Sequence, residues 1–146
     1  MTYRFIDSCQ RWAEQVEIQQ NAAMAWIAHS EGKATEALKL MRSAADAEDA
    51  SEKHVAMENR LWPMRELLGE MLLELKQPGP ALKEFEKALG EYPNRIRGFS
   101  GAARAAQAAG NRPKATEYYK KLATLTAKAD SGKKEAEDAK AFLAAR

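Results

Sequence analysis

A short pattern recurs along this sequence with a period of about 34 residues, lengthened to 44 between the first two copies, and this periodicity restricts the fold more than any other feature. Each copy has a small residue, a larger apolar residue four positions later, and another apolar residue three positions after that. The copies are Ala37, Met41 and Ala44; Ala81, Phe85 and Ala88, followed by Pro93; and Ala115, Tyr119 and Leu122. Steps of four and three place each set on one helix face. The period predicts stacked helical units that bury these faces against one another.

The segment before each repeated alanine also aligns without gaps, over residues 32–37, 76–81 and 110–115. Gly32 and Gly110 are each predicted to end a helix, because glycine adopts the left-handed conformation at little cost. Lys76 occupies the same position in the middle copy, where we expect Pro78-Gly79-Pro80 to break the chain instead. A small residue lies twelve positions before each alanine and allows close helix packing. These residues are Ala25, Gly69 and Ala103.

The composition agrees with a helical fold. The chain has 146 residues, of which 45% are hydrophobic and 30% are charged, with only 8 Gly and 5 Pro. Alanine is abundant and β-branched residues are few, which favours helix. We therefore expect one all-α domain that is large enough to bury a core.

The sequence resembles the tetratricopeptide repeat (TPR) family over about residues 22–128, most clearly over 63–94, PMRELLGEMLLELKQPGPALKEFEKALGEYPN. From about residue 23 onward it is also similar to the C-terminal region of large bacterial TPR proteins, a resemblance that implies no activity. The family resemblance implies a right-handed α-solenoid of about three helix pairs with a C-terminal capping helix. It also implies a scaffold for protein–protein interaction, which binds a peptide or a partner domain in a concave groove.

The repeats divide the predicted single domain, residues 1–146, into five parts. These are repeat one (about 18–50), a long link (51–61), repeat two (62–95), repeat three (96–129) and a capping helix (133–145). The expected helix pairs are 9–30 with 34–47, 63–75 with 80–90, and 95–109 with 113–127. The last helix would be capped by Asp130 or Ser131, and its apolar face would consist of Ala136, Ala139, Phe142 and Leu143.

Groove residues can be carried over from the TPR resemblance, because ligand contacts in that family fall at fixed positions on the first helix of each pair. The matching positions that could contact a partner are Gln19, Trp26, His29, Glu66, Glu70, Leu73, Arg97, Ser100, Arg104 and Gln107. Ala22 and Pro63 occupy two further matching positions. Each set has helical spacing of three or four, so it lies on one helix face.

Two interpretations of these charges stay open. Arg97 and Arg104 could hold an acidic group or a peptide carboxylate, since the guanidinium donates two parallel hydrogen bonds. Alternatively, Glu66 and Glu70 could pair with these arginines across adjacent helices, which would stabilise the fold by only about 0–1 kcal/mol per exposed pair. Family members that clamp the terminal carboxylate of chaperones use five basic and amide side chains. Only Arg97 matches that set, which disfavours chaperone-tail binding.

The aromatic and titratable residues also have two interpretations each. Trp26 could anchor an apolar ligand side chain or pack in the core beside Ala22, Ala23 and Ser30. His29 is more simply a surface or core histidine than a ligand. His54 lies near Glu52 and Glu58 in the long link, but the spacing matches no metal motif. The link itself is the best candidate for a contact outside the groove.

Motifs for catalysis are absent from the sequence. There is no glycine-rich phosphate loop and no nucleophile or metal motif, so we expect neither enzymatic activity nor a cofactor. Cys9 is the single cysteine, which excludes an intrachain disulfide. We expect it to pack as a small apolar residue.

Charge is unevenly distributed along the chain. Residues 1–75 hold 8 basic and 13 acidic side chains, whereas residues 76–146 hold 15 basic and 8 acidic ones. The basic half could attract an acidic partner, but it lacks the interleaved aromatics typical of nucleic-acid binding, which is therefore disfavoured. No signal peptide or transmembrane segment is visible, so we expect a soluble chain and assign no compartment.

A second function, from a different class, is a structural end-piece. In this hypothesis the repeats terminate a longer solenoid, or the chain forms a homodimer without a ligand of its own. It is motivated by the apolar residues Phe5, Trp12, Val16 and Ala23, which all lie on the first helix.

Overall fold

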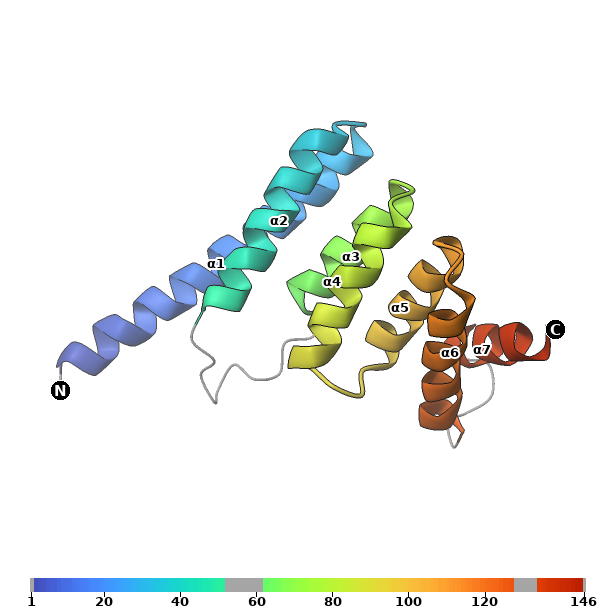
Figure 1. The fold of residues 1–146 in the computed structure, drawn as a ribbon. Helices are drawn as coiled ribbons and strands as arrows, with labels where there is room; N and C mark the ends of the chain where they lie inside the picture. Colours follow the sequence, from blue (N-terminus) through green and yellow to red (C-terminus); the bar gives the residue numbers. More distant parts are fainter. Residues whose placement is uncertain (1, 52–61, 128–133, 146) are drawn as a thin grey trace. The chain divides into compact units, whose positions relative to one another are not determined.

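The computed structural model describes residues 2–51, 62–127 and 134–145, with side chains from residue 12 onward. Every regular element in this part of the chain is a helix, as Figure 1 shows. The helices are α1 (Thr2–Ser30), α2 (Ala34–Ala50), α3 (Met64–Glu74), α4 (Pro78–Glu91), α5 (Ile96–Ala108), α6 (Arg112–Thr126) and α7 (Lys134–Ala144). The predicted all-α class with consecutive helix pairs is therefore confirmed.

Helix bounds agree with the prediction to within a few residues, except that α1 begins at Thr2 rather than near Cys9. The chain divides into two compact units, Met1–Leu68 and Gly69–Arg146, with the boundary inside α3. The prediction of one domain with these repeat limits stays a prediction. Asp130 and Ser131, the expected caps of the last helix, lie outside the described residues.

In the first unit, α1 packs along α2. The buried side of α1 consists of Ile18, Ala22, Ala25 and Ala28, and that of α2 includes the repeated residues Ala37, Met41 and Ala44. Small residues dominate both sides, which lets the two helices approach closely. Figure 1 shows that α1 is the longer helix and that its N-terminal half extends past the end of α2.

In the second unit, the ring of Phe85 on α4 is fully buried between two glycines. A Cβ atom built on Gly69 of α3 would lie 2.7 Å from this ring, and one built on Gly101 of α5 would lie 2.2 Å from it. Real Cβ atoms do not approach so closely, so both positions require glycine while Phe85 keeps this place. The prediction that Gly69 is a close-packing position is confirmed.

Three helices end in the same way. The amides of Lys33, Gln77 and Asn111 each donate to the carbonyl five residues earlier, on Ala28, Leu72 and Ala106. The residue before each amide has a positive φ, which is 78° at Gly32, 59° at Lys76 and 73° at Gly110. This is the Schellman arrangement. The role predicted for Gly32 and Gly110 is confirmed.

The expectation for the middle copy is wrong. Lys76 itself takes the left-handed conformation, and Pro78-Gly79-Pro80 does not break the chain but forms the first turn of α4. The physical reason is that proline fits the first turn of a helix, where its missing N–H has no partner to lose. The helix end thus has the same geometry in all three copies, even where lysine replaces glycine.

Helix α7 packs against α6. The rings of Tyr119 and Phe142 lie 4.4 Å apart between centroids, and Arg112 Nη2 donates to the carbonyl of Ala145 at 2.9 Å. Ala139 is fully buried, whereas Phe142 and Leu143 are partly buried. The predicted single apolar face of a capping helix is confirmed.

Candidate protein-binding surface

Five of the predicted groove residues have accessible side chains in the second unit. Glu70 and Leu73 come from α3, and Arg97, Arg104 and Gln107 come from α5. We call these five residues the α3/α5 face. Arg97 and Gln107 are exposed, and the other three are half-buried. Ser100, at the matching position between the arginines, is only 8% exposed and packs inside the unit.

Glu70 and Arg104 form an ion pair within this face, through Oε1 of the carboxylate and Nη2 of the guanidinium. Their side chains keep 27% and 41% of their surface exposed. Of the two open interpretations, this pair follows the second, in which a carboxylate on α3 neutralises an arginine on α5. The pair fixes the Arg104 guanidinium in position, so an incoming carboxylate would share it with Glu70.

Gln107 is also held by a neighbour. Tyr119 of α6 donates its hydroxyl proton to Gln107 Oε1 at 2.9 Å. Burial, followed by the nearby charge of Asp138, raises the pKa of Tyr119 above its ordinary value. The amide nitrogen of Gln107 therefore points away from Tyr119 and can donate to another group.

The remaining predicted residues belong to the first unit. Gln19 is exposed, and Trp26 and His29 are half-buried with their rings edge to face at 5.6 Å. Trp26 is thus neither fully core nor fully exposed. Glu66 is 1% exposed, and Ala22 and Pro63 are buried as well. The predicted groove residues therefore fall into two subsets, one in each unit.

A polar cluster on α4 and α6 lies outside the predicted set. Glu86 Oε1 accepts from Lys114 Nζ at 2.5 Å and from the Tyr118 hydroxyl at 2.7 Å. Burial by itself would raise the pKa of Glu86, but these two hydrogen bonds outweigh it and leave that pKa below its ordinary value. Burial and the bond to Glu86 raise the pKa of Tyr118. The cluster fastens α6 to α4.

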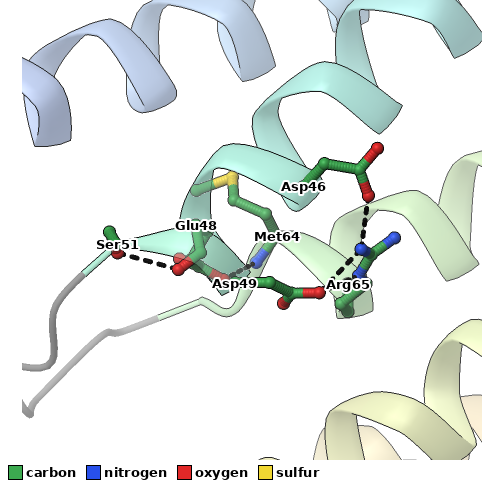
Figure 2. A network of polar contacts seen from close by, with 6 residues as sticks. All are labelled: Asp46, Glu48, Asp49, Ser51, Met64 and Arg65. Carbon is green, nitrogen blue, oxygen red and sulfur yellow. Dashed lines mark hydrogen bonds and ion pairs between the residues drawn. The ribbon is translucent and has the colours of Figure 1, made fainter.

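A second cluster connects the end of α2 to the start of α3, and Figure 2 shows it. Glu48 Oε2 accepts from the Met64 amide at 2.7 Å. Arg65 Nη2 donates to Asp46 Oδ1 at 2.5 Å and to Asp49 Oδ2 at 2.7 Å. We call these five residues the α2–α3 clamp.

The clamp supplies what the start of α3 lacks. Pro63 precedes the helix, and its side chain has no oxygen to accept from the first amides, so the carboxylate of Glu48 takes that role. The negative charge also suits the helix N-terminus. Sequence reasoning missed the clamp. One available signal was three acidic residues among the last five residues of α2, near a helix C-terminus, where acids are unfavourable unless a cation pairs with them.

Helix α1 carries a second apolar side that α2 does not cover. Trp12, Val16 and Ile27 are 59%, 63% and 58% exposed, and Ala23 is exposed too. At 100° per residue these positions lie on the side of α1 opposite Ile18 and Ala25. We call the row formed by Trp12, Val16, Gln19, Gln20, Ala23 and Ile27 the α1 stripe.

Among the residues with described side chains, no group of three or more His, Cys, Asp or Glu is arranged to hold a metal ion. The described helices include none that is both long and apolar enough to cross a membrane. His54 and its neighbours Glu52 and Glu58 lie outside the described residues.

Helices packed in consecutive pairs, with a repeated helix end and a repeated small residue at each crossing, define a TPR-like helical fold. No protein-family model matches the sequence, and no curated protein matches it. Among solved structures, the fold is similar to that of PcrH in its crystal structure with the chaperone-binding region of PopB. The TM-score is 0.65 with 19% sequence identity, over 86% of this chain and 94% of that chain.

Proposed function

We propose that this protein is a non-enzymatic scaffold that binds a peptide or a partner domain through the α3/α5 face. The observation that carries the proposal is the accessible row of Arg97, Arg104 and Gln107 on one side of α5. The Glu70–Arg104 ion pair joins this row to α3, where Leu73 is also accessible. Support also comes from the similarity to PcrH, which was crystallised with a segment of another protein.

The face suits a ligand that has an acidic group next to an apolar side chain. Arg97 and Arg104 are two helical turns apart, about 10 Å along the axis. Arg97 is exposed whereas Arg104 is half-buried, so Arg97 is the more accessible cation for a ligand carboxylate, and the Gln107 amide could donate to a peptide carbonyl. Glu70 holds Arg104 in place and would repel a second carboxylate near Arg104. An acidic group of the ligand should therefore bind at the Arg97 end of the face rather than at the Arg104 end. Arg97 is therefore the residue whose loss should weaken binding most.

A library of displayed 15-residue peptides, selected on the purified chain, provides the ligand for a direct test. We expect Arg97→Ala to raise the dissociation constant of a selected peptide about tenfold or more, since a charge-assisted hydrogen bond contributes about 1.5–3 kcal/mol. Lys83→Ala is the matched control, because Lys83 is an exposed cation on α4. Equal affinities for Arg97→Ala and Lys83→Ala would reject the assignment of this face.

A structural end-piece is a second candidate function, and the α1 stripe favours it. A tryptophan and two β-branched side chains with more than half of their surface in water are unusual on one helix face. In this function another protein surface covers the stripe. Val16→Lys should then abolish that association, whereas it should leave peptide affinity at the α3/α5 face unchanged.

A further inference from the structure

We infer that the α1 stripe binds a second copy of this chain, with the two α1 helices antiparallel and centred between Gln19 and Gln20. This inference rests on the second candidate function, in which protein covers the stripe, and it names the occupant. It does not depend on the α3/α5 face.

The first argument is that the stripe is its own complement. When two copies of one helix pair antiparallel about a twofold axis between Gln19 and Gln20, each position faces its mirror position. Trp12 then faces Ile27, Val16 faces Ala23, and Gln19 faces Gln20. Every member of the stripe thus meets another member. A twofold interface requires this self-complementarity.

Size and shape also match along this register. The two largest side chains, Trp12 and Ile27, pack at each end, and the pair of Val16 with the small Ala23 lies next to the centre. The central glutamines can hydrogen-bond to their counterparts, because an amide is both a donor and an acceptor. A polar pair within an apolar helix contact is a known means of fixing register and orientation.

Charge permits the same arrangement. None of the six residues of the stripe is charged. The carboxylates of Glu14 and Glu17, on the same part of α1, line a hollow with Ser43 and Ala47 of α2, so they lie toward α2 and away from the stripe. The stripe itself therefore places no carboxylate of one copy opposite a carboxylate of the other.

The area predicts a weak dimer. From the exposed fractions of Trp12, Val16 and Ile27, with 47% for Met24 at the edge, each copy would cover on the order of 400–500 Å². Two copies would bury about 1,000 Å² in total, below the size of standard stable interfaces and in the range of transient ones. Association should therefore depend on concentration.

Sedimentation velocity over a wide range of concentrations tests the association. We expect a reversible monomer–dimer equilibrium, and Val16→Lys and Ile27→Lys should each weaken dimerisation about tenfold or more. Leu125→Lys is the control, because Leu125 is an exposed apolar residue on α6 (39%) and should have no effect. Since all three side chains are exposed, none of these variants should unfold the chain.

The register is tested separately with cysteines in a Cys9→Ser background. A mixture of Val16→Cys and Ala23→Cys chains should form a disulfide-linked heterodimer on mild oxidation, whereas Val16→Cys alone should not. Linkage of Val16→Cys to itself would indicate a parallel pair and overturn the inference. A chain that stays monomeric at every concentration would overturn it as well, without affecting the peptide test at Arg97. A dimer insensitive to Val16→Lys would also overturn this inference, because its contact would then lie outside the α1 stripe, whereas the second candidate function fails only if no protein surface covers the stripe.

Discussion

At the residue scale, two local features affect the stability of the second unit. Phe85 fills its site only because Gly69 and Gly101 leave room for the ring. Lys76 has to take a conformation that glycine would take at lower cost. Both features lie in the second unit and can be tested by single substitutions.

Gly101→Ala should lower the free energy of unfolding by about 1–3 kcal/mol, because the new methyl group overlaps the buried Phe85 ring. Gly90→Ala is the matched control: it lies in α4, and nothing is within 4 Å of its added Cβ. That variant should gain about 0.5–1 kcal/mol from helix propensity. Urea denaturation measures both. A Gly101→Ala chain as stable as Gly90→Ala would contradict the packing of Phe85.

Lys76→Gly should raise the free energy of unfolding by about 1 kcal/mol, since the residue has a φ of 59° at the end of α3. Gly110→Ala imposes the reverse change at the equivalent position, where φ is 73°, and should cost a similar amount. Thermal melts followed by circular dichroism compare the two. Destabilisation by Lys76→Gly would mean that Lys76 is not in the left-handed conformation.

At the element scale, side chains of one helix form hydrogen bonds with polar groups of another helix. The α2–α3 clamp supplies the cap that Pro63 cannot, and Glu86 of α4 joins two donors of α6. Each contact joins two helices that a sequence pattern describes one at a time. Each can be tested by substituting its carboxylate.

Glu48→Ala should lower the free energy of unfolding by about 1–2 kcal/mol, because the Met64 amide loses its acceptor at the start of α3. Glu48→Gln retains an oxygen at this site and should cost less. Hydrogen exchange should report the loss locally, with faster exchange of the amides in the first turn of α3. Unchanged exchange there in Glu48→Ala would show that Glu48 does not cap this helix.

Glu86 should make stability depend on pH. Its pKa in the folded chain lies below the ordinary value, so its contribution is present above the unfolded pKa of about 4.3 and is lost as pH falls through the folded pKa. Between about pH 5 and pH 3, the wild type should therefore lose more stability than Glu86→Gln. The difference should be below about 1 kcal/mol, because the site is partly solvated. Parallel slopes for the two chains would contradict the network.

At the scale of the whole molecule, the repeat pattern predicted the fold class, the helix pairs and the capping helix. It succeeded because apolar steps of three and four and the Schellman glycines are local signals. It could not predict that Lys76 would adopt a glycine-like conformation, because stacking of neighbouring helices overrides local preference there. The pairing of Glu70 with Arg104 was only one of two alternatives, since the choice depends on the distance between α3 and α5.

The candidate site was less predictable than the fold. The groove positions expected from the TPR resemblance include accessible residues such as Arg97 and buried ones such as Glu66 and Ser100. Burial depends on the neighbouring side chains in space, which the position within a repeat does not specify. The clamp was missed since its partners, Asp46 and Arg65, are separated by the long link. The exposure of the α1 stripe likewise depends on which side of α1 the second helix covers.

The central claim is that a partner binds at the α3/α5 face, and hydrogen exchange with and without a selected peptide tests it most directly. The account predicts slower exchange in Gly69–Glu74 and Ile96–Ala108 when the peptide is bound, and loss of this protection in Arg97→Ala. Protection confined to α4 and α6, with none on α3 or α5, would contradict the account.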